Sequence, residues 1–434
     1  MIRITAITLG LLLIAAISVA NDESSDIRHR AIVYLLPKVD AANNVNVGKY
    51  FDGYTVLDVF PENTQTPSLS YEVLAEFSGN YPPPNEEFLA YFGRGVSKEQ
   101  AEQVQQARLA VVINVAYPSS LVFQQLRKFS QSLHDLATQE GGLIWDSETR
   151  ELFGLETWQA KRLDTWHNDI PEIESHTTIH VYNNDPGVRA ITLGMVKFGL
   201  PDIVVNDLSW SSGRDMGNLI NLLAQSLLEG KADLGTDTID ININKLSDTP
   251  FKERLVASLY DNAVETVSIG YREGHWEDGD PYNMLMELEF DQYEGESVRA
   301  KQDSLISALF GWKDDITYVQ HNQEILAASE KARQQLPALR EDFNKGLAPG
   351  EFIQVKAPFA TPDDGKEWMW VEILSWQGKQ IKGLLKNEPY NIPDLRAGEE
   401  VYVNEDEVFD YIRTYPDGRT IGNQTGELIM KYSN

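Results

Sequence analysis

Lys366 to Tyr411 reads KEWMWVEILSWQGKQIKGLLKNEPYNIPDLRAGEEVYVNEDEVFDY. Side chains alternate in character from Trp368 to Ile373 and again from Gln380 to Lys386, which is the period of β-strands. Gln377-Gly378, between these runs, has the composition of a tight turn, and Ala397-Gly398 forms a second one. Short strands separated by glycine turns predict a small, strongly bent sheet or an SH3-like barrel.

Two glycines of this stretch should have specific backbone roles. Gly383 lies within a strand pattern, where glycine marks a bulge or the close approach of another backbone. Gly398 lies in a turn, where a positive φ is expected.

The same stretch carries a resemblance to a known family. The residues that match are Trp370-Val371-Glu372, Gly378, Gly383, Leu385, Asn387, Pro389, Leu395, Gly398, Val401, Val403, Val408, Asp410, Gly422 and Thr425. Their order and spacing resemble the YegJ-like domain, a bacterial domain of unknown function, over residues 349–434. Tyr411 departs from the family, which tends to carry tryptophan there. The resemblance implies a compact α+β or β domain and no reaction.

The composition limits both the partners and the chemistry of the chain. The 434 residues include 66 acidic and 37 basic side chains, which give a formal net charge of −29, and no cysteine. Nucleic-acid binding needs patches of lysine and arginine, so we expect no nucleic-acid partner. The absence of cysteine excludes disulfides and thiol chemistry, so core packing must stabilise the fold.

The N-terminus has the pattern of a secretory signal. Arg3 precedes an apolar run from Ile7 to Ala16, and Ser18-Val19-Ala20 forms a small-residue cleavage site. Residues 1–20 are therefore predicted to be a signal peptide, and the mature protein to be periplasmic or secreted. An uncleaved membrane anchor is the alternative. No later stretch could span a bilayer, so no stable membrane span is expected after cleavage.

Strand and helix patterns recur along the rest of the chain. Leu109 to Ala116 is nearly continuously apolar, as in a buried strand, and Val122 to Leu136 carries apolar residues at helical spacing. This recurrence predicts an α+β fold with antiparallel sheets and helices on one face. The expected divisions are an N-terminal α+β region at 21–105, a central α+β region at 106–323, a helical connector at 324–348 and the YegJ-like domain at 349–434.

The histidines give the strongest candidate for a catalytic site. Polar residues, of which two are glutamates and two are histidines, occupy every second position in the series Glu172, Glu174, His176, Thr178 and His180. On one strand these side chains would share a face, and with His167 they could form the carboxylate and histidine site of an exported hydrolase. On a regular strand His176 and His180 would lie ~13 Å apart, too far to bind one metal. A polar strand face exposed to solvent is therefore the favoured interpretation.

Other catalytic motifs are missing from the sequence. It contains no Gly-x-Ser-x-Gly elbow, no phosphate-binding loop and no dinucleotide fingerprint. We therefore expect no cofactor or metal, and the sequence identifies no catalytic residues. The candidate binding surface consists of Trp368, Trp370, Trp376 and Asn387, because exposed aromatic side chains anchor peptides. The alternative is that the tryptophans fill the core of the C-terminal domain.

The sequence leaves three functional hypotheses. The leading one is a non-enzymatic, exported protein that binds an unidentified protein or peptide. The others are the exported hydrolase and an acidic, immunity-type protein that neutralises a basic partner. A pocket that brings together several of His167, Glu174, His176 and His180 would favour the hydrolase, whereas a single large acidic face would favour the basic partner.

Overall fold

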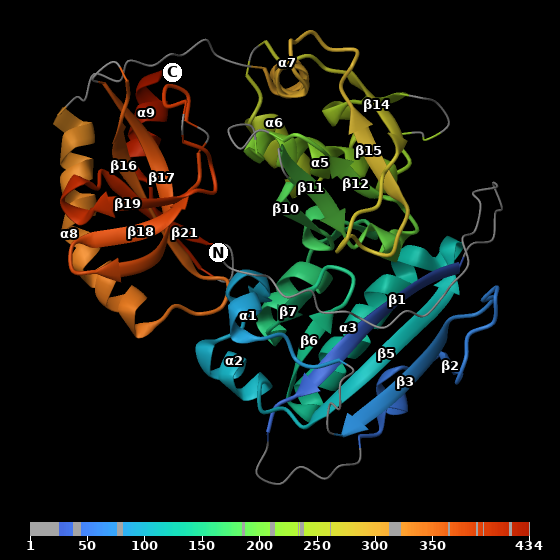
Figure 1. Ribbon diagram of the computed structural model, residues 1–434. Coiled ribbons are helices and arrows are strands. Elements are labelled where there is room, and N and C mark those ends of the chain that lie inside the picture. The colour runs from blue at the N-terminus through green and yellow to red at the C-terminus, as the bar shows by residue number, and fades with distance from the viewer. Residues whose placement is uncertain are drawn as a thin grey trace.

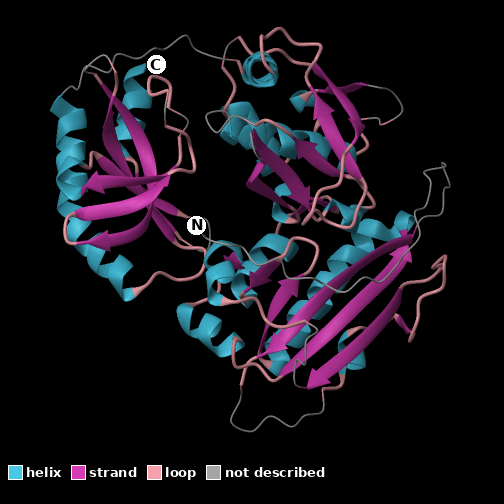
Figure 2. Ribbon diagram, viewed as in Figure 1, coloured by secondary structure: helices cyan, strands magenta, loops and turns pink. Residues whose placement is uncertain are grey.

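The described part of the chain forms three large β-sheets, each with its own helices, and a small two-stranded sheet (Figures 1 and 2). The computed structural model describes residues 26–37, 45–75, 81–184, 187–208, 213–232, 234, 238–260, 262–311, 323–362, 365–387, 389–393, 395–415 and 419–433. The predicted signal peptide lies outside these residues. The predicted α+β class with a strand-rich C-terminal region is confirmed.

The first sheet has seven strands. Their order across the sheet is β2 (Thr55–Val56), β3 (Ser68–Ala75), β5 (Leu109–Pro118), β1 (Asp26–Leu35), β6 (Gly142–Asp146), β7 (Glu151–Phe153) and β4 (Gly93–Arg94). The central strand, β1, pairs antiparallel with β5 along its whole length and with β6 along half of it. The sheet thus contains strands from both sides of the division expected between residues 105 and 106.

Helices cover both faces of this sheet. On one face Val111, Ile113 and Val115 of β5 pack with Phe129 and Leu133 of α3 (Val122–Glu140). On the other, alternate strand residues pack with side chains of α1 (Glu86–Phe92) and α2 (Lys98–Val104). This burial of both faces explains the continuous apolar run of β5, and it differs from the expected helices on one face.

The second sheet has six strands. Their order is β10 (Thr178–Asn184), β11 (Gly187–Leu193), β12 (Asp202–Val205), β15 (Leu285–Glu289), β14 (Val267–Glu273) and β13 (Thr238–Ile241). β12 and β15 run parallel, and the other neighbours run antiparallel. The accompanying helices are α5 (Gly213–Leu228), α6 (Pro250–Ala257) and α7 (Val298–Phe310).

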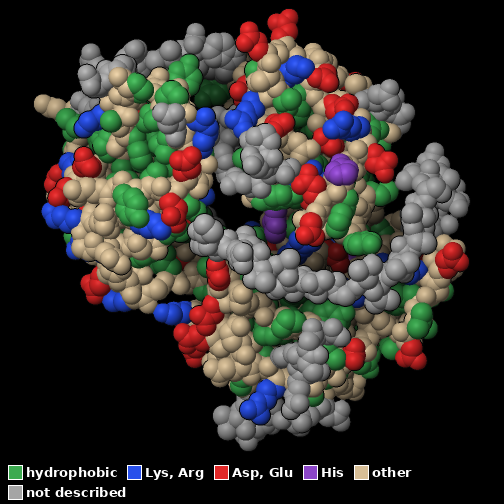
Figure 3. All heavy atoms as spheres, viewed as in Figure 1, with side chains coloured by type: hydrophobic (Ala, Val, Ile, Leu, Met, Phe, Trp, Pro, Cys, Tyr) green, Lys and Arg blue, Asp and Glu red, His purple; other side chains and the backbone are tan. Residues whose placement is uncertain are grey.

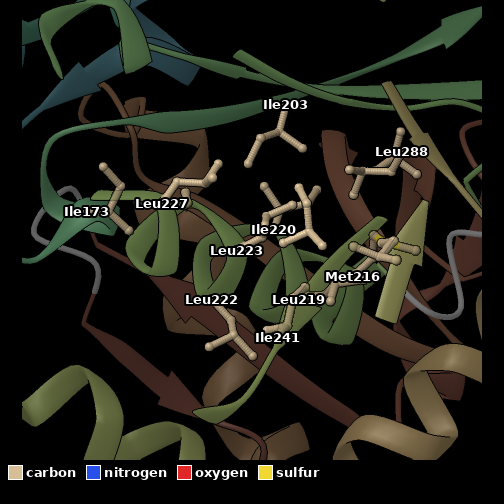
Figure 4. Packing of buried hydrophobic residues seen from close by; sticks show 14 of the residues in the cluster. Ile173, Ile203, Met216, Leu219, Ile220, Leu222, Leu223, Leu227, Ile241 and Leu288 are labelled. Carbon is tan, nitrogen blue, oxygen red and sulfur yellow. The ribbon is translucent and has the colours of Figure 1, made fainter. Parts of the chain in front are cut away.

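The core of this part forms between α5 and the sheet. Figure 4 shows Leu219, Leu223 and Leu227 of α5 close to Ile203 of β12 and Leu288 of β15. These three leucines are four residues apart, so the helix places them on one buried face.

The third sheet is antiparallel throughout. Its order is β19 (Glu400–Asn404), β18 (Gln380–Leu385), β17 (Lys366–Gln377), β16 (Phe352–Ala360), β20 (Asp410–Thr414) and β21 (Thr420–Gly422). Its helices are α8 (Gln323–Lys345) and α9 (Gln424–Ser433). The strands predicted from Trp368 to Ile373 and from Gln380 to Lys386 correspond to β17 and β18.

Helix α8 contributes to the core of the third sheet. Leu336 and Leu339 are buried in the same cluster as Val355 and Val371 of the sheet. The helix continues through Pro337 to Lys345. The segment expected as a connector at 324–348 therefore supplies core residues to the sheet that follows it.

The two glycines have the expected backbone roles. A Cβ at Gly383 would overlap the carbonyl oxygen of Glu372 on β17, where the β17–β18 register shifts between Ile373 and Ser375. Gly398 has a φ of 83°, and its N–H donates to the carbonyl oxygen of Leu385 at 2.7 Å. The turn at Gly398 thus fixes the return of the chain toward β18.

We predict that Gly398→Ala destabilises the third sheet by about 1–2 kcal/mol, because an L-residue is strained in the left-handed region. The exposed Lys379 offers a control, since its surface ion pair with Asp406 contributes little. Denaturant melts of the protein should show a lower midpoint for Gly398→Ala and little change for Lys379→Ala. Equal stability of Gly398→Ala and wild type would contradict the positive-φ argument.

Candidate functional site

A cleft of about 280 Å³ lies where the three sheets approach one another. Its lining includes Arg94, Glu151, Lys161, Thr178, Phe352 and Tyr415. Lys161 comes from the turn at Gln159–Leu163, and the others come from β4 and β7 of the first sheet, β10 of the second, and the segments around β16 and β20 of the third. Figure 3 shows the molecular surface hollowed between the C-terminal part and the rest of the chain.

A single π-helical turn places two basic side chains at this cleft. The turn η3 (Gln159–Leu163) follows α4 (Leu155–Trp158), and the N–H of Asp164 donates to the carbonyl oxygen of Gln159 at 3.0 Å. π-Helical turns are rare and are often found at functional sites. Lys161 and Arg162 both line the cleft, but Arg162 is only 2% exposed and extends into a buried network of charges.

Asp146 is the centre of that network. Its Oδ2 lies 2.6 Å from Nζ of Lys197 and 3.1 Å from Nη2 of Arg162, and its Oδ1 accepts hydrogen bonds from the backbone N–H of Glu148 and Thr149. Burial opposes the charged form of Asp146, but Lys197 and Arg162 outweigh it and hold the pKa of this carboxyl well below its usual range. Because Lys197 belongs to the turn η5 (Met195–Phe198), the network ties the first sheet to the connection between β11 and β12 of the second.

Two histidines lie beside this network. His29, His176, Asp146 and Lys197 line an inner cavity of about 10 Å³, a volume near that of one water molecule. Burial lowers the pKa of His29 to about 3 and lowers the pKa of His176 well below its usual value. Both imidazoles are therefore neutral near pH 7.

The interpretation of residues 172–180 as one exposed strand face is wrong. Ile173 to Ser175 form the 3-10 turn η4, His176 is fully buried, and β10 begins only at Thr178. The turn rotates the chain, so the regular spacing of acidic and histidine residues does not place them on one face.

The four residues that would favour a hydrolase do not converge on one pocket. Glu174 lines the cleft and pairs with Arg254, whereas His176 lines the inner cavity. His167, on β8 (Trp166–His167), lies next to β9 (Ile170–Pro171) with Nε2 3.2 Å from Oε1 of Glu172. His180 stacks on Phe92 with ring centroids 4.6 Å apart. Within the described residues, no group of three or more histidine, aspartate or glutamate side chains is placed to hold a metal ion.

The residues of the predicted aromatic surface lie in two different environments in the third sheet. Trp376 is 2% exposed, and its indole N–H donates to Glu405 at 2.9 Å. Trp368 and Trp370 are half-buried, and Oδ1 of Asn387 accepts from the backbone N–H of Trp370 at 2.6 Å. Trp376 therefore lies in the core, and only Trp368 and Trp370 of the predicted tryptophans present surface.

Lys161 differs from the other charged residues of the cleft. Arg94 pairs with Glu151 at 2.6 Å, and Arg162 pairs with Asp146. Among the residues that the structure describes, no carboxylate pairs with Lys161, and burial lowers the pKa of its ammonium. The cleft therefore offers a partly desolvated cation to an anionic group. Sequence reasoning missed this residue, because the adjacent basic pair Lys161-Arg162 does not stand out: Arg127-Lys128 is a second such pair in the chain.

Strand β10 brings an edge of the second sheet to the cleft. It pairs with β11 over seven residue positions, and in the described part of the chain no strand pairs with its other side. Figure 1 shows β10 on the side of its sheet that faces the C-terminal sheet. Thr178 and Ile179, at its start, line the cleft. An edge strand presents backbone N–H and C=O groups that can pair with another extended chain.

Comparison with known proteins gives a partial match. Residues 322–432 match a family described as an uncharacterized protein conserved in bacteria (DUF2314). An alignment of 105 residues, which covers 22% of this chain, is 32% identical to a putative ankyrin repeat protein of Neisseria meningitidis serogroup B and covers 42% of that protein. The chain therefore spans less than half of this relative. No solved structure matches the chain significantly.

In the described residues, which begin after the N-terminal apolar run, no helix is long and apolar enough to cross a membrane.

We predict that Asp146→Ala destabilises the protein by roughly 3–5 kcal/mol, because it leaves two buried cations without their shared carboxylate. Asp248→Ala is the control, since Asp248 forms an exposed pair with Lys252 and should change stability little. Chemical denaturation of both variants measures the difference. Similar midpoints for the two variants would show that the buried network contributes no more than a surface pair.

A second prediction concerns Glu148, whose Oε1 accepts from the backbone N–H of Arg30 at 2.9 Å. Burial raises the pKa of this carboxyl to about 7. Between pH 4.5 and 7 the folded state thus binds more protons than the unfolded state, so this group's contribution to stability falls as pH rises. We expect the stability of wild type relative to Glu148→Gln to fall by about 2 kcal/mol over this range, less than the full shift because the side chain is partly exposed.

Denaturant melts of both proteins at several pH values between 4.5 and 7.5 measure this difference. The comparison with Glu148→Gln is needed because buried neutral histidines change stability in the opposite direction over part of the same range, and their contribution is common to both proteins. A difference that does not depend on pH would mean that Glu148 titrates normally.

Proposed function

We propose that the protein is a non-enzymatic, exported peptide-binding protein, and that an extended peptide binds in the cleft by adding a strand to β10. The observation that carries this proposal is the unpaired side of β10, among the described strands, at the wall of the cleft. The peptide would lie between β10 and the C-terminal sheet, which we propose to be a YegJ-like domain.

Strand addition suits the dimensions of the site. The cleft volume of about 280 Å³ is slightly below the range of ligand pockets, which is about 300–1,000 Å³. The cleft itself can enclose only a short part of a peptide, while β10 provides seven residues for backbone pairing. Main-chain hydrogen bonds would supply affinity, and side chains of the cleft would supply selectivity.

The arrangement of the candidate groups favours binding over hydrolysis. His167, Glu174, His176 and His180 occupy separate environments, and the carboxylates of the cleft are engaged with arginines. On the face shown in Figure 3, acidic side chains are interspersed with lysines and arginines. That distribution gives no support to an acidic face built for one basic partner.

The N-terminal sequence supports a location outside the cytoplasm. Arg3, the apolar run and Ser18-Val19-Ala20 have the order of a secretory signal. The periplasm or the exterior is therefore the proposed place of action.

The proposal can be tested with a synthetic library of octapeptides incubated with the mature protein. Peptides retained on the protein are identified by mass spectrometry, and their affinities are measured by calorimetry. In an added strand, alternate residues direct their N–H toward the edge. N-methylation of every second peptide residue should therefore weaken binding by about fivefold for each lost hydrogen bond, and methylation of the intervening residues should not.

A matched pair of variants tests the location. Thr178→Trp places a bulky side chain in the cleft at the start of β10, whereas Thr238→Trp changes the first residue of β13, at the opposite edge of the same sheet. We expect Thr178→Trp to reduce affinity more than about tenfold and Thr238→Trp to leave it unchanged. Failure to retain any octapeptide, or equal effects of the two variants, would contradict the proposal.

A further inference from the structure

The geometry points to a selectivity determinant within this site: we infer that the cleft binds peptides through a carboxylate that pairs with Lys161. This inference rests on the proposed peptide-binding function and names the chemical group that the peptide must carry.

The charges that line the cleft support an anionic ligand. They comprise the cations Arg94, Lys161 and Arg162 and the carboxylates Glu151 and Glu174. The lining is thus net positive, although the chain as a whole carries −29. A positive cleft in an acidic protein attracts an anionic group and disfavours a cationic one at the same place.

Lys161 is the cation with capacity for a ligand. The guanidinium of Arg94 donates a hydrogen bond to Glu151. The guanidinium of Arg162 donates to Asp146 and to the carbonyl oxygen of Ser175. Glu174 pairs with Arg254 rather than with Lys161. Within the described chain, the ammonium of Lys161 has no carboxylate within ion-pair distance, and a lysine ammonium can donate three hydrogen bonds.

The location of Lys161 strengthens the interaction that it can make. The π-turn directs Arg162 into the buried network and leaves its neighbour Lys161 on the cleft wall. Burial already lowers the pKa of Lys161, because water only partly solvates its charge. A carboxylate that pairs with this ammonium would replace the hydrogen bonds that water does not supply there. The pair would also be stronger than in bulk water, because the dielectric constant of the cleft is lower.

The same cleft contains the start of β10, at Thr178 and Ile179. A peptide paired with β10 can therefore place one end beside Lys161. Its carboxylate can come from the C-terminus of the peptide or from an aspartate or glutamate side chain, and the experiment distinguishes the two sources.

The test uses an octapeptide selected by the mature wild-type protein in three forms. The first form is unmodified, the second has an amidated C-terminus, and in the third each aspartate and glutamate is replaced by asparagine or glutamine. A charge-assisted hydrogen bond supports a change of about tenfold or more. We expect one of the modified peptides to lose that affinity: the amide if the C-terminus binds Lys161, and the third form if a side chain does.

Lys161→Met should weaken the unmodified peptide by the same factor and should not further weaken the modified peptide that has lost its carboxylate. Lys231→Met is the control, because Lys231 is exposed and does not line the cleft. The peptide forms are compared on the wild-type protein, so the test holds even if Lys161→Met folds poorly.

The outcomes separate the two proposals. If both modified peptides bind as tightly as the unmodified one, and binding keeps its alternating response to N-methylation, the carboxylate inference is wrong and strand addition stands. If the peptides depend on a carboxylate but Lys231→Met weakens them as much as Lys161→Met, the assignment to Lys161 is wrong. If the protein retains no octapeptide, the peptide-binding function fails and this inference fails with it.

Discussion

The contact between the carboxylate of Asp146 and the two cations Lys197 and Arg162 is the constraint on which the centre of the molecule depends. The three groups lie on β6, on the turn before β12 and in the π-turn, so one carboxylate connects segments from two sheets. Removing charges from water is costly, and such a buried network persists only where its hydrogen bonds are well satisfied. Asp146 meets this condition, since both of its oxygens accept hydrogen bonds.

The network also determines what the cleft can offer. The network binds the guanidinium of Arg162 in the protein interior, so this cation is not exposed. The adjacent Lys161 stays on the cleft wall. A regular α-helix would give two successive residues directions about 100° apart and would continue the hydrogen bonds of α4. The π-turn interrupts that pattern at the two neighbouring residues, one of which supports the buried network while the other lines the cleft.

The sequence revealed features that repeat locally. The strands of the C-terminal sheet, the apolar face of α3 and the positive φ of Gly398 follow from residue spacing and turn chemistry, which act over a few positions. The candidate site was not predictable in this way. Asp146 and Lys197 are brought together by tertiary packing, and the alternating residues before His180 suggested a strand where a 3-10 turn intervenes.

The position of β1 at the centre of the first sheet affects how the chain can fold. β1 is the first described strand, yet Asp26 pairs with Pro118 and Ala31 with Asp146. During synthesis, the central strand therefore has no neighbour until β5, at residues 109–118, has left the ribosome, and its second neighbour, β6, follows only at residues 142–146. Contacts so distant along the chain slow folding, because a long loop must close before any pairing is gained. The topology thus postpones pairing of the first described strand until much of the first sheet has been synthesised.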